Sequence, residues 1–272
     1  MATGGLDYRP NANTVLGIAA TAVRSDADLA DNTGGLDRDE TSLTVYGSFY
    51  RDAWYVDLAL STGRSSYQQS RIIGYRLGNG TAVSQQMSAD YDGSAHSAHA
   101  SLGWDGAWPW ASNSADPGST SAWSVGLRAS VDYLNAKADA FTEQPGDPNG
   151  NGAGWAVNVD AQSQDWLTAR VSASTRKVVT TPWGVLVPFV ELDLIQEFAN
   201  RQNTVNTRFV SDVSNTALAV SLEDPDHSYV RARLGSTFQL PGGLAGFVDY
   251  GRLFAFDRWQ AYTLSAGVRY EL

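Results

Sequence analysis

Long runs of alternating apolar and polar residues restrict the fold of this chain more than any other feature. The C-terminal run consists of Tyr262, Leu264, Ala266, Val268, Tyr270 and Leu272, separated by small or polar residues. Because successive side chains of a β-strand point to opposite faces, such a run is typical of a strand with one apolar face. Similar alternation recurs at 54–61, 123–133, 155–162, 167–174 and 230–240. The sequence therefore predicts an all-β protein.

The length and the charge of these runs favour a membrane barrel over the alternatives, a soluble β-sandwich or β-helix. Expected strands such as 53–72 and 81–106 far exceed the usual length of about five or six residues. Mid-strand Arg and Asp occupy the polar face alone, and Lys occurs only at positions 137 and 177. Charged residues make up 18% of the chain, below the roughly 25% of ordinary domains, and aromatic residues reach 11%. We predict a transmembrane antiparallel β-barrel with an apolar belt, aromatic girdles and a polar lumen.

Eleven strands can be read directly from the alternation and the turn residues. They lie near 3–9, 13–25, 40–51, 53–72, 81–106, 121–138, 154–179, 184–200, 217–239, 245–256 and 259–272. Because single-chain bacterial barrels have an even number of strands, we expect about twelve, in one domain that spans 1–272. Either a further strand before Gly4 or a hairpin at Asp92-Gly93 would supply the difference.

Short turns alternate with long polar segments near 26–39, 73–81, 139–153 and 200–216. Bacterial barrels have short periplasmic turns and long outer loops, so we expect these segments outside the cell. The long segment from Trp108 to Ser121 departs from this alternation, because it falls on the periplasmic side.

The composition excludes several classes of protein. There are no cysteines, so disulfide scaffolds, thiolate zinc sites and cysteine nucleophiles are excluded. The net charge is −10 and no basic stripe is present, so we expect no nucleic-acid partner. No apolar run reaches the ~18 residues that a transmembrane helix needs. The first residues lack a signal-peptide pattern, so an exported chain is expected to begin further upstream.

Candidate catalytic and metal-binding groups are sparse. His96, His99 and His227 show no HExxH spacing, and the alternation places His96 and His99 on opposite faces. No G-x-S-x-G nucleophile motif occurs. Residues 147–152 resemble the first half of a calcium loop, but its twelfth position is Asn158 instead of a bidentate Glu. We therefore expect a non-enzymatic protein with no catalytic residues, metal site or cofactor.

Several segments resemble the autotransporter β-domain in their order and spacing. They are Gly5-Leu6-Asp7-Tyr8-Arg9-Pro10, Leu16-Gly17-Ile18-Ala19, Tyr46-Gly47-Ser48-Phe49, Pro188-Phe189-Val190-Glu191-Leu192 with Gln196-Glu197-Phe198, and the terminal segment from Tyr262 to Tyr270. The resemblance covers almost the whole chain. It implies a twelve-stranded translocator barrel of type V secretion in the bacterial outer membrane, which secretes or anchors its own N-terminal passenger. It also implies a pore-crossing helix upstream of the barrel. The sequence shows no such helical stretch before Gly4 and lacks the Asn-Asn cleavage site of some members, so self-cleavage is not predicted.

The C-terminal residues fit the signal that the barrel assembly machinery reads in this family. The pattern of a polar residue, a glycine, an aromatic residue and a final hydrophobic residue is met by Ser265, Gly267, Tyr270 and Leu272. A strand with one apolar face and an open edge can pair with a foreign edge by β-augmentation. The family usually ends in Phe, and the alternative is an ordinary amphipathic strand. The expected partners are the assembly machinery, outer-membrane lipid and lipopolysaccharide, and the passenger.

In a membrane barrel, the polar face of each expected strand lines the lumen and the apolar face contacts lipid. Charge is costly in lipid but tolerable in a wet lumen. The expected lumen-lining residues are Asp57, Arg128, Asp132, Asp160, Arg170, Glu191, Asp193, Arg231 and Arg233, and the expected lipid-facing residues include Trp54, Leu127, Val157, Leu234 and Leu264. The charged set lines a translocation path, grips a pore helix or only stabilises the barrel. Alternative functions are an outer-membrane channel, an adhesin-type barrel without a passenger, and a barrel hydrolase.

Overall fold

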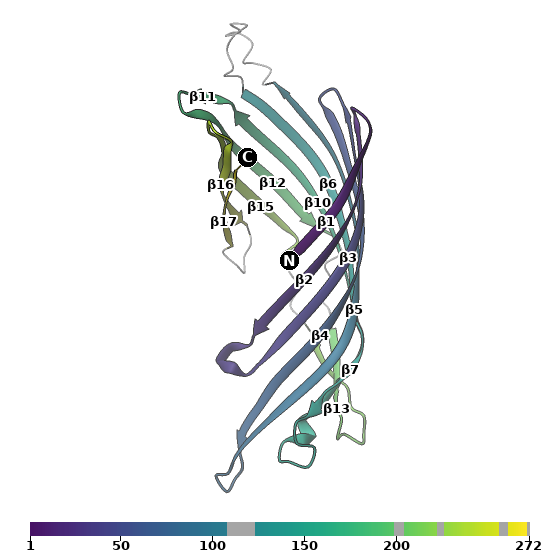
Figure 1. Ribbon diagram of the computed structural model, residues 1–272. Coiled ribbons are helices and arrows are strands. Elements are labelled where there is room, and N and C mark those ends of the chain that lie inside the picture. Colours follow the sequence, from purple (N-terminus) through teal and green to yellow (C-terminus); the bar gives the residue numbers. More distant parts are fainter. Residues whose placement is uncertain (108–122, 199–203, 222–225, 256–260, 271–272) are drawn as a thin grey trace.

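The computed structural model describes residues 1–107, 123–198, 204–221, 226–255 and 261–270. Within these residues, eleven strands follow one another in one curved antiparallel sheet (Figure 1). Their bounds are β1 Ala2–Asn11, β2 Thr14–Asp28, β3 Gly34–Arg51, β4 Trp54–Arg76, β5 Ala82–Ala107, β6 Trp123–Ala138, β10 Gln162–Lys177, β12 Gly184–Glu197, β15 Ser228–Gln239, β16 Leu244–Phe254 and β17 Tyr262–Tyr270. The short strands β8 (Gln144–Pro145) and β11 (Val179–Thr181) pair with β5 and β12. The predicted all-β fold is confirmed.

Short turns and long connections lie at opposite ends of the sheet. Tight turns follow β1, β3, β11 and β15 at what we call the turn end, uppermost in Figure 1. The opposite end, called the loop end, carries the hairpin of β4 and β5, which stay paired as far as Arg76 and Ala82. Trp108 to Ser121 lies outside the described residues. Among the described residues, the edge strand β1 pairs only with β2, and the edge strand β17 only with β16.

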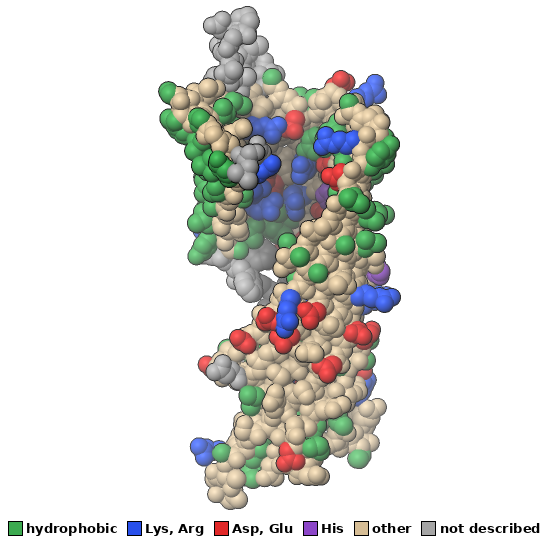
Figure 2. All heavy atoms as spheres, in the orientation of Figure 1, with side chains coloured by type: hydrophobic (Ala, Val, Ile, Leu, Met, Phe, Trp, Pro, Cys, Tyr) green, Lys and Arg blue, Asp and Glu red, His purple; other side chains and the backbone are tan. Residues whose placement is uncertain are grey.

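The register separates an apolar convex face from a polar concave face. On the convex face, Trp54, Leu127, Leu234 and Leu264 are each at least 50% exposed, as expected for side chains that face lipid. Arg and acidic side chains instead gather in the hollow of the curved sheet near the turn end (Figure 2). Within the described residues, no helix is long and apolar enough to cross a membrane.

Three expectations about the strands are corrected. β10 begins at Gln162 and not at 154, and β15 begins at Ser228 and not at 217. The reason is that the alternation before each of them belongs to short strands of a second sheet, so Val157 does not face lipid. The hairpin expected at Asp92-Gly93 is also wrong, because β5 pairs with β4 without interruption through both residues. Gly93 instead permits a close approach, since a Cβ there would lie 2.6 Å from the Lys137 carbonyl oxygen.

The second sheet forms a loop module at the loop end. We use this name for residues 141–160 and 204–221. The module contains β7 (Phe141–Thr142), β9 (Val157–Val159), β13 (Thr204–Phe209) and β14 (Leu218–Ser221), in the order β14-β13-β9-β7, and the 3₁₀ helix η3 (Ala153–Trp155). A further 3₁₀ turn, η1 (Ala30–Asn32), joins β2 to β3. Of the six buried apolar side chains that the structure describes, Val83, Met87, Ala89, Ala156 and Val159 lie in the module or beneath it on β5. The tightest apolar packing therefore lies at the loop end.

Candidate functional site

Ion pairs across neighbouring strands form the charged part of the concave face. Arg231 on β15 lies directly opposite Asp193 on β12, and its Nε donates to Asp193 Oδ2 at 2.6 Å. The Asp193 side chain is only 1% exposed. Arg233 reaches both Glu191 at 3.1 Å and Asp249 of β16 at 3.4 Å. The period of two puts these five residues on one face, and the register sets the acids of β12 beside the arginines of β15.

Three more arginines extend this surface across β6 and β10. Arg128 Nε donates to the Tyr55 hydroxyl at 3.1 Å, and the guanidinium stacks on the Tyr55 ring. Arg176 lies 3.3 Å from Asp105. The Nε of Arg170 is buried and has no hydrogen-bond partner among the described atoms. The arginine wall, as we call Arg128, Arg170, Arg176, Arg231 and Arg233, borders a hollow of 270 Å³.

Two expected acids lie on the same face but outside that hollow. Asp57 accepts hydrogen bonds from Ser48 at 2.7 Å and from Ser101 at 3.2 Å. Asp132 Oδ1 lies 2.6 Å from Nδ1 of His99. His96 projects from the opposite face and contacts Thr62, as the alternation predicts. Among the described contacts, no serine hydroxyl reaches a histidine, so the arrangement shows no Ser–His pair.

The rest of the concave face carries little charge. Strands β1 to β4 contribute mainly small or neutral side chains there, such as Gly5, Ala19, Thr44 and Ser61. Asp7 and Asp57 are acidic exceptions, and Arg38 and Glu40 of β3 form an ion pair on the same face nearer the loop end. The Tyr46 hydroxyl donates to Asp7. An arginine wall therefore faces a mostly neutral wall across the curved sheet.

One expected lumen residue lies elsewhere, and three were missed. Asp160 is not on a barrel strand, because it follows β9 in the loop module, where it pairs with Arg208 at 2.5 Å. The module shares the period of two, so alternation alone cannot separate it from the barrel. Asp105, Arg176 and Asp249 belong to the charged face, and continuing the same parity along β5, β10 and β16 would have found them.

The terminal strand places most of the expected assembly residues in register with β16. Gly267 lies opposite Phe247, and a Cβ on Gly267 would come within 2.5 Å of the Phe247 ring. Glycine is thus required for this ring to lie flat across the strand. Ser265 lies opposite Asp249 on the concave face, and Tyr270 is exposed on the convex face. Leu272 lies outside the described residues.

A buried ion pair fixes the loop module to β4. Both nitrogens Nε and Nη2 of Arg71 donate to the Glu143 carboxylate at 2.5 Å. Glu143 is 2% exposed and also accepts the backbone N–H of Val157 at 3.1 Å. The stacked rings of Tyr67, Tyr91 and Phe141 extend this contact, with centroids 4.9 and 4.3 Å apart. The module is therefore a packed cap on the hairpin.

Local hydrogen bonds order the exposed loops. Backbone N–H groups of Thr216 and Ser214 donate to the Asp212 carboxylate and lower its pKa. In the segment 147–152, which resembles half of a calcium loop, Asp147 Oδ1 accepts from the Asn149 N–H in an Asx turn. Within the described part of the chain, no three His, Asp or Glu residues are grouped to hold a metal ion.

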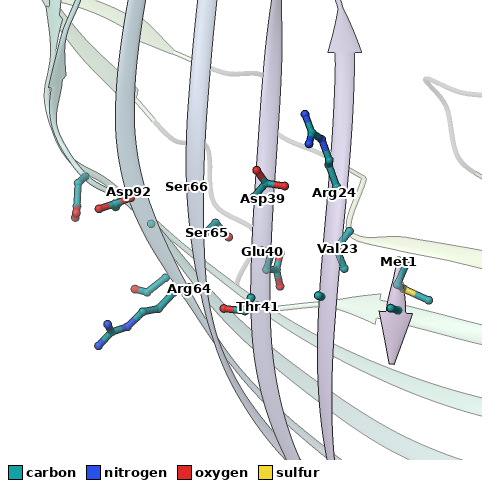
Figure 3. A pocket seen from close by; sticks show the side chains of 15 residues that line it. Met1, Val23, Arg24, Asp39, Glu40, Thr41, Arg64, Ser65, Ser66 and Asp92 are labelled. Atoms are coloured by element: carbon teal, nitrogen blue, oxygen red, sulfur yellow. The ribbon is translucent and has the colours of Figure 1, made fainter. Parts of the chain in front are cut away.

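A hollow of 780 Å³ lies between the first strands and not at the arginine wall. Figure 3 shows its labelled side chains spread over neighbouring strands without converging on one point. Arg24 and Arg64 there accompany Asp39, Glu40 and Asp92. Because it is open and its charges are dispersed, we assign it no chemistry.

Comparisons with known proteins agree with this architecture. The family model described as the autotransporter beta-domain matches residues 1–251. The translocator domain of the autotransporter NalP from Neisseria meningitidis superposes with a TM-score of 0.62 at 17% identity, covering 98% of this chain and 79% of that chain. The β-domain of the Bordetella autotransporter BrkA gives a TM-score of 0.59 at 18% identity, covering 99% of this chain and 89% of that chain. No curated protein matches the chain significantly.

Proposed function

Because this chain belongs to the autotransporter β-domain family, we propose that its arginine wall lines the path of the passenger. The protein is a type V secretion translocator of the bacterial outer membrane, and it exports a passenger. It acts as a transporter and not as an enzyme. The proposal concerns which of its residues the passenger meets.

The asymmetry of the concave face carries this proposal. An extended polypeptide in the lumen would find mainly small neutral side chains on β1 to β4 and hydrogen-bonding guanidinium groups opposite them. The Arg231 and Arg233 side chains stay 32% and 34% exposed beside their acidic partners, so their guanidinium groups can still donate hydrogen bonds to a passing chain. Many weak hydrogen bonds to the arginine wall, each readily replaced by the next, would allow the passenger to move without being trapped.

A reporter passenger fused to the barrel tests this role of the wall. Arg128→Gln removes a charge whose hydrogen bond goes to the Tyr55 hydroxyl, so the ion pairs of the barrel remain intact. We expect slower appearance of the reporter at the cell surface, with an unchanged amount of folded barrel. The matched control is Arg252→Gln, because Arg252 stacks on Phe254 and lies outside the arginine wall. Wild-type export rates in Arg128→Gln would mean that this arginine only stabilises the barrel.

We further propose that Ser265, Gly267, Tyr270 and Leu272 form the signal read by the barrel assembly machinery. The support is the edge of β17, which pairs only with β16 among the described residues, together with the flat contact of Phe247 on Gly267. Replacing Tyr270 by Ala and deleting Leu272 should slow insertion sharply and leave most of the urea midpoint of the refolded barrel intact. Both quantities are measured on the same variant, and normal insertion would leave only an amphipathic strand.

The loop end is proposed to face the cell exterior and to contact lipopolysaccharide. Polar residues replace apolar ones on the convex face near this end, where the Tyr133 hydroxyl and Asn135 donate to Asp165. The chain has no native thiol, so Asn149→Cys provides a single labelling site in the loop module. An impermeant maleimide should label it on whole cells, and labelling only after permeabilisation would reverse the orientation.

The whole of 1–272 is proposed as one barrel domain, closed by a further strand between β1 and β17. Unpaired backbone groups cost several kcal/mol each in a bilayer, so open sheet edges do not persist against lipid. A twelfth strand, as the even number of bacterial barrels requires, would pair with both edges.

A further inference from the structure

An apolar hollow of 520 Å³ lies on the convex face of β4, β5, β6 and β10. Its centre is Ala129, which lies directly opposite Leu102 on one side and Val171 on the other. The short alanine side chain between two longer ones creates the depression. Trp54 and Trp104 line it toward the turn end, and the Trp104 ring lies flat on Gly106 and leaves the depression open. The volume falls within the range of about 300–1,000 Å³ of small-ligand sites.

Two cations border the same surface at the turn end. The Lys177 ammonium lies 5.5 Å from the centroid of the Trp123 ring, and Lys177 pairs directly with Trp123 in the sheet. Arg51 lies opposite Trp54 in the sheet. Lysine occurs at only two positions in the chain, so its presence beside this girdle is distinctive. Aromatic rings and cations at this level suit the headgroup region of a bilayer.

The spacing between the cation and the hollow matches one leaflet. Val171 and Lys177 occupy the same strand and face, six residues apart, which is about 20 Å at ~3.3 Å per residue. A strand tilted by about 45° converts this to roughly 14 Å of depth, close to half of the ~30 Å hydrocarbon core. A lipid with its phosphate at Lys177 would thus extend its chain alongside the hollow.

We propose that this hollow holds one anionic glycerophospholipid of the periplasmic leaflet, with its phosphate at Lys177 and an acyl chain over Ala129. The assignment rests on the orientation proposed above, in which the turn end faces the periplasm. The apolar lining selects an acyl chain, and the cations select a negatively charged headgroup.

Native mass spectrometry of the full chain, purified from outer membranes in mild detergent, tests the steric half of the proposal. The wild type should retain one phosphatidylglycerol. Ala129→Leu fills the centre of the hollow and should reduce retention at least tenfold. Ala98→Leu adds the same atoms to the convex face outside the hollow, between Leu60 and Tyr133, and should retain the lipid like the wild type. Equal retention in both variants would overturn the site.

Exchange with defined vesicles tests the charge. Lys177→Gln should weaken phosphatidylglycerol binding about fivefold, which corresponds to the ~1 kcal/mol of one lysine near an anionic surface. Lys137→Gln, the loss of the other lysine, should have no effect. Equal binding of phosphatidylcholine, or retention of lipopolysaccharide instead, would overturn the headgroup assignment. Passenger display, scored in the same cells, reports export separately, so a wild-type protein that exports normally but retains no phosphatidylglycerol rejects the lipid site alone.

Discussion

The ion pair between Arg71 and Glu143 gives the sharpest prediction for the loop module. Glu143→Gln preserves the size of the side chain but removes its charge, so the bidentate contact with Arg71 is lost. Breaking a buried ion pair by neutralising one partner costs about 3–5 kcal/mol. Glu143 is 2% exposed but Arg71 is 32% exposed, and water can solvate the freed guanidinium. We therefore take a lower figure, about 2–3 kcal/mol.

The assay is native-state hydrogen exchange read by mass spectrometry. A local destabilisation of 2–3 kcal/mol corresponds to roughly 30- to 150-fold faster exchange in residues 141–160 and 204–221, provided that exchange follows the opening equilibrium. Barrel strands such as β10 and β12 should be unaffected. Asp160→Asn is the control, because the Asp160–Arg208 pair is exposed to solvent and its loss should leave the protection of the module nearly unchanged. Unchanged protection of the module in Glu143→Gln would refute the claim that this pair fixes the cap.

Three further predictions concern other parts of the molecule. Leu127→Arg, on the exposed convex face, should lower the unfolding free energy in lipid by about 2–4 kcal/mol near the bilayer midplane, and an unchanged urea midpoint would contradict its lipid contact. Gly267→Val should slow insertion, since the added side chain would occupy the position of the Phe247 ring of β16. Pulse-chase measurement of the heat-modifiable form gives the insertion rate, and a wild-type rate would contradict this. The pKa of Asp212 is lowered by the N–H groups of Thr216 and Ser214, so its contribution to loop order is fully present above the unfolded value of about 3.9. That contribution is lost as the pH falls through the lower folded value, so hydrogen exchange of the loop should rise in acid. Asp212→Asn should abolish this rise. An identical rise in the variant would show that the Asp212 carboxylate does not order the loop.

The barrel could be predicted from the sequence because its determinants are local. Alternation fixes the face of each residue, and tight turns fix the sequence neighbours of each strand. Asp57, Arg128 and Arg231 accordingly lie on the concave face as expected. The hydrogen-bond partner of each residue depends on the register between strands, which alternation does not specify. The contact of Arg128 with Tyr55 therefore could not be predicted from the sequence.

The loop module could not be predicted, because its contacts join distant segments. Arg71 and Glu143 are 72 positions apart, and β9 pairs with β13 across the whole of β10 and β12. Short strands of the module repeat the period of the barrel strands, which is why Asp160 and Val157 were assigned to the barrel. Loop length marks where such a module is inserted but not how it folds.

Site-specific crosslinking during export tests the central claim most directly. A photoreactive residue at 128 or 231 would lie on the concave face, whereas one at 127 or 234 would lie on the convex face. With a passenger stalled in transit, we predict crosslinks to the passenger from 128 and 231 and none from 127 and 234. Crosslinks from the convex positions, or none from the concave ones, would contradict passage of the passenger along the arginine wall.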